Sequence, residues 1–263
     1  MENRAKSAIL DLELSRRLHG ALTCGKEELF EALRDPSLDV IRAALRNPAL
    51  DENHLHALLG RRDLTEELLK AISQLQLVGE SHNLKVVMVN NPRTPASLVM
   101  TLLPQLYLFE LVAVCFLPGV TPDQRLAAER AIMQRLPMTP LGNKITLARR
   151  ATATVLDALL KERVVKLVEP CLENPRLKEA SVYRLVSSPG TPAEAIAAVA
   201  RHPHWGARPN LRNAMLGNPG TPVPLLATLL PTAPILELKK LASGRFGAER
   251  RRLAEQELRR RAR

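Results

Sequence analysis

Residues 217–230 read GNPGTPVPLLATLL, and two earlier segments of the chain are written in nearly the same way. Residues 90–103 read NNPRTPASLVMTLL, and residues 187–196 read SSPGTPAEAI. In each segment, Asn-Pro or Ser-Pro is followed by Thr-Pro and then by apolar residues at helical spacing. This recurrence indicates that the chain uses one structural unit several times.

The Asn-Pro-x-Thr-Pro stretch predicts the end of one helix, a sharp corner and the start of the next helix. Gly217 and Asn218 tolerate the left-handed backbone conformation that often ends a helix, and Pro219 cannot continue one. We expect Thr221 to cap the following helix with its hydroxyl group and Pro222 to occupy the first position of that helix. Many of the 20 prolines are placed in this way, which predicts many short helices and essentially no sheet.

The sequence also aligns with itself, without a gap, when residue numbers are shifted by 127 (174 − 47 and 218 − 91). This repeat offset places Asn47-Pro48 on Asn174-Pro175, and Asn91-Pro92 on Asn218-Pro219. Within each half, a helix, Asn-Pro and helix unit recurs after 44 residues (84 − 40 and 211 − 167), a period in the range of HEAT and armadillo repeats. We therefore expect an all-α protein, a right-handed α-solenoid of short helices built from two tandem copies, residues 1–136 and 137–263, in one continuous solenoid.

Residues 40–59, VIRAALRNPALDENHLHALL, resemble the leucine-rich repeat variant, in which a short helix precedes Asn-Pro and a second helix ends in leucine-rich positions. Residues 84–103 and 211–230 fit this pattern more closely. The resemblance implies a HEAT-like right-handed helical solenoid. One member of that class is associated with a cysteine-ligated iron–sulfur cluster, but the cysteines here, Cys24, Cys115 and Cys171, are scattered. We therefore expect no cofactor and no metal site.

Residues 98–117 are nearly all apolar, with only Gln105 and Glu110 strongly polar, and are long enough to cross a bilayer. However, Pro104 interrupts them, and the corresponding residues 225–244 contain Lys239 and Lys240, which would be costly in a membrane. We expect two buried helices broken near Pro104 and no membrane span. The first residues of the chain carry charges and no secretory signal pattern, which predicts a cytoplasmic protein.

Catalytic motifs are not recognisable in the sequence, and we expect no enzyme. The most site-like segment is His202-Pro-His204-Trp205, which holds the only tryptophan. It either takes part in a metal or substrate site or forms a loop whose tryptophan packs between helices, as Val78 would at the corresponding position. Carboxylates that match between the halves, such as Glu110 and Glu237, are possible acid–base groups. Four other matched acids fall instead in expected first turns, where they favour the helix dipole: Glu52, Glu67, Glu179 and Glu194.

Charge distinguishes the two halves. The net charge is +11, with 16 basic and 17 acidic residues in 1–136 against 22 and 10 in 137–263. A strongly basic segment suggests a polyanion partner, although a solvated terminal repeat is an alternative explanation. The candidate polyanion-binding residues are Arg245, Arg250, Arg251, Arg252, Arg259, Arg260 and Arg261.

Together these features predict a non-enzymatic helical-repeat scaffold that mediates protein–protein interaction. The alternative is a nucleic-acid-binding module that uses the basic C-terminal half.

Overall fold

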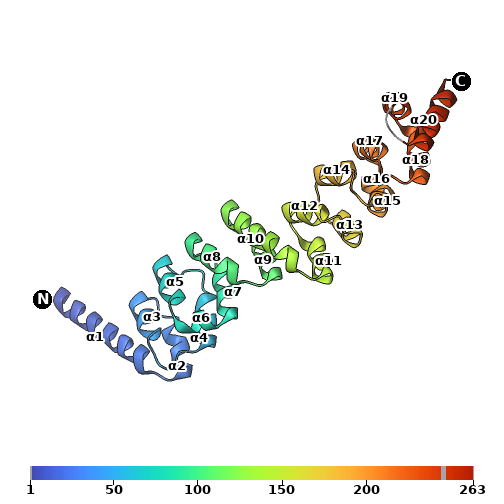
Figure 1. Ribbon diagram of the computed structural model, residues 1–263. Helices are drawn as coiled ribbons and strands as arrows, with labels where there is room; N and C mark the ends of the chain where they lie inside the picture. Colours follow the sequence, from blue (N-terminus) through green and yellow to red (C-terminus); the bar gives the residue numbers. More distant parts are fainter. Residues whose placement is uncertain (1, 244–246, 263) are drawn as a thin grey trace. The chain divides into compact units, whose positions relative to one another are not determined.

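The computed structural model describes the backbone of residues 2–243 and 247–262 and, in the first helix, the side chains from residue 12 onward (Figure 1). In these residues every regular element is an α-helix or a 3-10 helix, and none is a strand. The prediction of an all-α protein is therefore confirmed.

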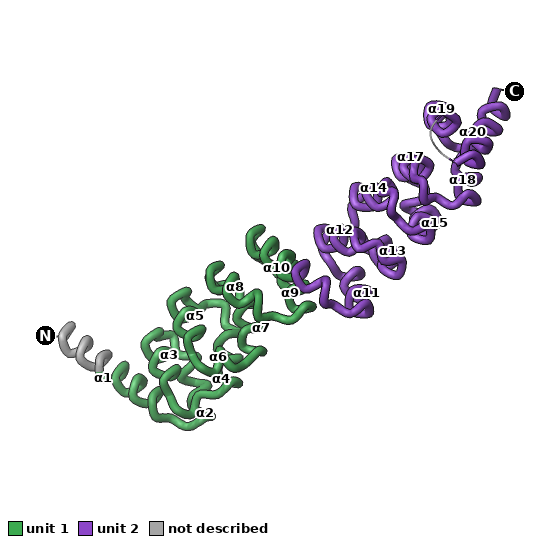
Figure 2. The backbone as a smooth tube through the Cα atoms, viewed as in Figure 1, with its two compact units in different colours: residues 1–131 green, residues 132–263 purple. Residues whose placement is uncertain are grey.

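The chain divides into two compact units, residues 1–131 and 132–263 (Figure 2). The boundary between them falls inside α10 (Pro122–Arg135), whereas the sequence repeat places the division after residue 136. Each unit is described by itself below.

In unit 1, a helix packs mainly on helices two or three places away in chain order, which produces two rows of helices. α1 contacts α3, and α2, α4, α7 and α9 form a second row in which each helix contacts the next. The helices are α1 (Glu2–Thr23), α2 (Lys26–Ala32), α3 (Leu38–Ala44), α4 (Glu52–Leu59), α5 (Glu66–Ser73), α6 (Gln76–Glu80), α7 (His82–Asn90), α8 (Ala96–Leu102), η1 (Leu103–Gln105), α9 (Leu108–Val114) and the first part of α10.

Unit 2 has the same alternation. α11, α13 and α15 form one row, and α12, α14, α17 and α19 form the other, while α20 packs on α18 and α19. From α2 to α9, the start of each helix in unit 1 matches the start of a helix in unit 2 at the repeat offset. After α10 the elements are η2 (Leu136–Met138), α11 (Leu141–Arg150), α12 (Ala153–Lys161), α13 (Val165–Leu172), α14 (Glu179–Ser187), α15 (Ala193–Arg201), α16 (Pro203–Gly206), α17 (Pro209–Gly217), α18 (Val223–Leu229), η3 (Leu230–Thr232), α19 (Ile235–Ser243) and α20 (Ala248–Arg261).

The apolar residues 98–117 fall into α8, η1 and α9, so the expected break near Pro104 is confirmed. In α8, Val99 is buried and Met100 is exposed; in α9, Leu111 is buried and Phe109 is exposed. These helices therefore bury one face each rather than their whole surface. Among the described residues, no helix combines the length and the apolar character that a membrane crossing needs.

A buried asparagine at each Asn-Pro holds consecutive helical layers together. Asn218 is only 1% exposed. Its Nδ2 donates hydrogen bonds to the carbonyls of Val186 (2.5 Å) and Ser188 (2.9 Å), and its Oδ1 accepts one from the N–H of Gly220 (2.7 Å). One side chain therefore caps the C-terminal end of α14 and also shapes the turn that follows α17.

The same bonds recur at the other three Asn-Pro sites, all of them buried. Asparagines that correspond at the repeat offset bind carbonyls that also correspond at that offset. The acceptors are Ala21 and Cys24 for Asn47, Leu59 and Arg61 for Asn91, and Ala148 and Ala151 for Asn174. The donors to Oδ1 are the N–H groups of Ala49, Arg93 and Arg176.

The expected roles of threonine, proline and asparagine at the corner were wrong in detail. The Thr221 hydroxyl donates to the carbonyl of Met215 (2.5 Å), at the end of the preceding helix. Pro222 is the residue before α18, which begins at Val223, and Asn218 has an extended rather than a left-handed backbone (φ −83°, ψ 124°). The prolines of the turn have no N–H to offer, so the buried hydroxyl supplies a donor that the helix end lacks. Two further threonines do the same: Thr94 to Met88 (2.6 Å) and Thr191 to Leu185 (2.5 Å).

Aliphatic side chains fill the core of each unit, as the 3% aromatic content requires. In α15, Ala195, Ile196 and Val199 are fully buried at helical spacing. Burying one aliphatic side chain of this size contributes about 1.5–3 kcal/mol, so short helices of this kind depend on packing against their neighbours for stability.

Replacing Asn218 by alanine leaves two buried carbonyls and one N–H without their partner. We expect the free energy of unfolding to fall by about 2–4 kcal/mol, because each unsatisfied buried polar group costs on the order of 1–3 kcal/mol. Urea unfolding followed by fluorescence measures this, since Trp205 is the single tryptophan and lies buried in unit 2. The control is Asn143→Ala, at an exposed position in α11. Equal stability of the two variants would contradict the structural role of Asn218.

Candidate interaction surfaces

The basic residues of α20 separate into two groups, and the first group serves the fold. Arg250 donates to the carbonyls of Asn218 (2.7 Å), Pro219 (2.5 Å) and Thr221 (2.5 Å). Burial lowers the pKa of the Arg250 guanidinium, but the group stays charged at neutral pH. Arg250 therefore fixes the turn between α17 and α18.

Arg261 has a similar role near the other end of α20. It donates to the carbonyls of Leu230 and Ala233 (2.7 Å each) and to the carboxylate of Glu257 (2.8 Å). Arg260 also donates to Glu257 (2.9 Å). The hydrogen bonds from Arg260 and then Arg261 lower the pKa of Glu257. Arg261 is therefore committed to contacts inside unit 2, whereas Arg260 is 66% exposed and pairs only along its own helix.

The second group is free to meet a partner. Arg251, Arg252 and Arg259 are exposed, and within the described part of the chain no hydrogen bond or ion pair of their side chains is found. Arg252 and Arg259 are two helical turns apart in sequence, so they share one side of α20. Arg245 lies outside the described residues. Of the six candidate arginines that the structure describes, these three combine exposure with no intramolecular hydrogen bond or ion pair, and they are the best placed for phosphate contacts.

The segment around Trp205 is structural. Trp205 is 6% exposed, and its Nε1 donates to the carbonyl of Leu172 (3.0 Å). His202 precedes α16, and its Nδ1 accepts from the N–H of His204 (3.3 Å). Of the two alternatives, the burial of the tryptophan agrees with the packing role, although the segment forms the short helix α16 rather than a loop. Its counterpart Val78 is also buried. Over residues 2–243 and 247–262, no group of three or more His, Cys, Asp or Glu side chains is arranged to hold a metal ion.

The matched carboxylates have local structural partners. Glu110 accepts from the N–H of Tyr107 (2.7 Å) and pairs with His82 Nε2 (2.8 Å), whose ring stacks on Tyr107 at 3.9 Å between centroids. Glu237 pairs with Lys240 (2.7 Å). The prediction that the other matched acids fall in first turns is confirmed for Glu52, Glu67, Glu179 and Glu194.

The cysteines behave as apolar residues. Burial raises the pKa of Cys115 to about 11 and that of Cys171 to about 12. Both thiols therefore stay protonated at neutral pH and are poor nucleophiles.

A groove on unit 2 was not visible in the sequence. It has a volume of about 880 Å³ and lies across α14, α17 and α19. Its lining includes the small residues Ala180, Ala214 and Gly217, which let a partner approach the helix backbones. Tyr183 also lines the groove and is 47% exposed. The groove is also lined by Glu179, Ser187, Asn210, Asn213, Glu237 and Lys240.

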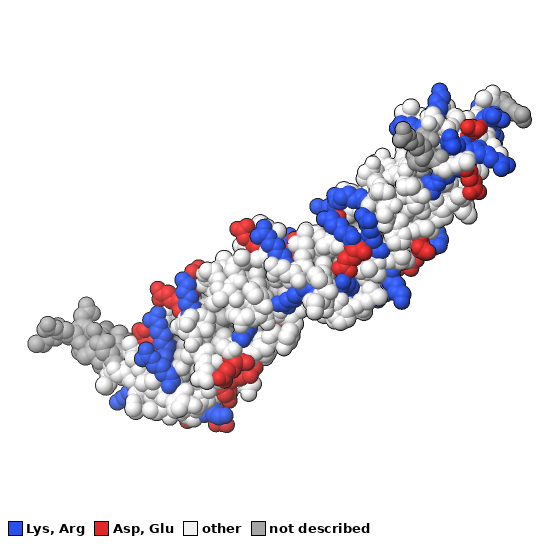
Figure 3. All heavy atoms as spheres, in the orientation of Figure 1, with Lys and Arg blue, Asp and Glu red and all other residues white. Residues whose placement is uncertain are grey.

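Within each unit, charge on the visible face does not form one continuous basic field. In Figure 3, Lys and Arg side chains lie in separate clusters, most of them with Asp or Glu nearby. Arg208 and Glu179 (3.6 Å) and Arg184 and Asp157 are pairs of this kind in unit 2.

No protein-family model, curated protein or solved structure matches the chain. Functional inference therefore rests on the surfaces described above.

Proposed function

We propose that the protein is a non-enzymatic helical-repeat scaffold, and that it binds another protein in the groove across α14, α17 and α19. The observation that carries this proposal is the groove itself. It is open and contains the exposed ring of Tyr183, and tyrosine is one of the residue types enriched in protein interfaces.

The proposal includes the architecture. The helices form a right-handed α-solenoid of the leucine-rich repeat variant or HEAT type, built from two tandem copies. The constant offset between corresponding helix starts supports the duplication, and so do the matching bonds of Asn91 and Asn218. The proposal also places the protein in the cytoplasm, which its free cysteines, Cys24, Cys115 and Cys171, support.

The polar groups of the groove favour a partner of mixed character. Glu179 is paired with Arg208 and lies 3.4 Å from Asn210 Nδ2, and Glu237 is paired with Lys240. Because these carboxylates are already paired with basic side chains, we expect long-range electrostatic attraction to contribute little to binding of a partner in the groove. Recognition depends instead on hydrogen bonds to Asn210 and Asn213 and on contact with the Tyr183 ring, since exposed tyrosines are common anchors of protein interfaces.

Site-specific photo-crosslinking tests this surface. A photoreactive phenylalanine analogue at Ala214, in the groove, should crosslink a defined partner protein, whereas the same analogue at Lys166, exposed on α13 in the other row, should not. Adding Tyr183→Ala should reduce the yield at position 214 by about tenfold, because it removes the anchor. Identical products from positions 214 and 166, or a yield unchanged by Tyr183→Ala, would argue against the groove.

A second function, nucleic-acid binding, is favoured by one observation, the three exposed arginines of α20. Each phosphate contact by such a residue adds affinity that falls with salt. Removing the whole C-terminal segment would also remove the contacts of α20 with α18 and α19, so single-residue changes separate binding from folding.

The matching experiment measures fluorescence anisotropy of labelled single-stranded and duplex oligonucleotides across a salt series. Changing Arg251, Arg252 and Arg259 to alanine should weaken binding and reduce the slope of log affinity against log salt by up to about 3, close to one per phosphate contact. The control changes three other exposed basic residues of unit 2, Arg149, Arg150 and Lys166, by the same total charge. No binding near physiological salt, or equal losses in both variants, would leave the arginines as a solvated surface.

A further inference from the structure

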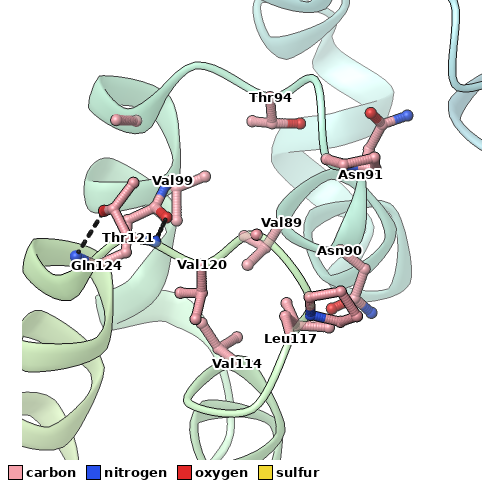
Figure 4. Close-up of a pocket in the computed structure, with 14 residues that line it drawn as sticks. Val89, Asn90, Asn91, Thr94, Val99, Val114, Leu117, Val120, Thr121 and Gln124 are labelled. Atoms are coloured by element: carbon pink, nitrogen blue, oxygen red, sulfur yellow. Dashed lines mark hydrogen bonds between the residues drawn. The ribbon is translucent and has the colours of Figure 1, made fainter.

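Unit 1 contains a cavity of about 160 Å³ between the turn that joins α7 to α8 and the turn that joins α9 to α10. Figure 4 shows Asn91 and Thr94 on the first turn and Thr121 and Gln124 at the second, with valine side chains between them. The apolar lining includes Val89, Val99, Val114 and Val120. The cavity therefore combines an apolar wall with the polar residues of the two turns.

The corresponding turn in unit 2, between α17 and α18, binds an arginine side chain of the same unit. At the repeat offset, Asn91, Pro92 and Thr94 correspond to Asn218, Pro219 and Thr221. In unit 2, the guanidinium of Arg250 donates to all three carbonyls of that turn, at 2.5–2.7 Å. One guanidinium can donate to three carbonyls because its N–H groups lie in one plane and point in fixed, different directions.

Unit 1 has the acceptors of this arrangement but lacks the donor. The position that corresponds to Arg250 is Asp123 (250 − 127), which is exposed in the first turn of α10. The turn itself is preserved, because the Asn91 carbonyl accepts from the Thr94 N–H at 3.0 Å, as the Asn218 carbonyl does from Thr221 at 3.1 Å. Within the described residues, no hydrogen bond to the carbonyls of Pro92 or Thr94 is found.

We propose that this cavity binds the guanidinium group of an arginine side chain presented by a partner polypeptide. The carbonyls of the α7–α8 turn accept its N–H groups, and the valines contact its aliphatic stem. The Asp123 carboxylate, next in sequence to the lining residue Gln124, adds attraction for a cation. The Oε1 of Gln124 accepts a hydrogen bond from the Thr121 N–H (2.9 Å), which fixes the position of this side chain at the cavity.

The geometry also selects among cations. A lysine ammonium is a compact charge whose donors do not lie in one plane, so it matches the three carbonyls less well than a guanidinium. Citrulline has the shape of arginine without the charge, so it isolates the contribution of the cation. This proposal adds one chemical feature of the partner, an arginine side chain, to the scaffold function. It rests on the scaffold function in one respect, namely that the arginine belongs to a polypeptide.

The test titrates N-acetyl-arginine amide into the full-length protein and follows backbone amide signals by NMR. We expect millimolar, saturable shifts of the Arg93, Thr94 and Gln124 amides, with at least about fivefold weaker binding of the lysine and citrulline analogues. No saturable shift at these amides, or equal binding of the three analogues, would overturn the proposal.

Asp123→Arg provides the decisive variant, because it supplies to unit 1 the internal guanidinium that Arg250 supplies to unit 2. We expect it to reduce the affinity for the probe at least tenfold and to raise Tm. Asp123→Asn, which keeps the cavity open, should reduce affinity only a few-fold. If Asp123→Arg leaves probe binding unchanged, the cavity is not the site; if the variant does not fold, the comparison of arginine, lysine and citrulline probes still decides.

Free L-arginine distinguishes the two sources of a guanidinium. It carries an α-ammonium and an α-carboxylate, which an arginine residue inside a polypeptide lacks. If the site takes a polypeptide arginine through its guanidinium and aliphatic stem, free arginine should bind no more tightly than the amide, and binding tenfold tighter than the amide would overturn the assignment to a polypeptide. This site lies in unit 1 and the proposed groove lies in unit 2. A failed titration with successful crosslinking at position 214 therefore rejects the guanidinium site alone, and the reverse result rejects the groove alone.

Discussion

The fold depends on how the carbonyls at the ends of its short helices find donors. A helix leaves its last carbonyls unpaired, and the turns here are rich in proline, which has no N–H to give. The asparagine of each Asn-Pro resolves this with one buried side chain that donates twice and accepts once, as Asn218 does for Val186, Ser188 and Gly220. Because its acceptors lie 30 and 32 residues earlier in the chain, the same side chain fixes which helix ends meet, and so sets the packing of the rows.

Arginines meet the same requirement at other helix ends. Arg61 donates to the Leu33 carbonyl (2.6 Å), Arg93 to that of Arg62 (3.2 Å), and Arg250 and Arg261 bind the turns beside α20. Part of the positive charge of the chain is therefore devoted to holding the fold. This use of arginine links the fold to function in two ways. It reduces the number of α20 arginines that can contact a polyanion, and among the described residues no arginine binds the α7–α8 turn of unit 1.

Much of the architecture could be predicted from the sequence because short local motifs determine where the helices begin and end. Proline and Asn-Pro positions placed the helix ends, and the break near Pro104, the buried Trp205 and the first-turn acids were all predicted correctly. The roles of Thr221 and Arg250 were not, because they depend on burial and on partners that sequence spacing alone does not identify. Thr221 binds back to the preceding helix instead of capping forward, and Arg250 binds a turn that lies well before it in the chain. The groove was missed for the same reason: Ala180, Ala214 and Gly217 belong to segments that only helix packing brings together with α19.

The most direct measurement of the central claim is proton exchange of asparagine side-chain amides by NMR. The Nδ2 protons of Asn47, Asn91, Asn174 and Asn218 are buried and hydrogen-bonded to carbonyls. They should exchange with solvent far more slowly than those of exposed Asn143, and at rates that follow the opening of the surrounding helices. Exchange as fast as that of Asn143 would contradict the view that these four side chains hold the helical layers together.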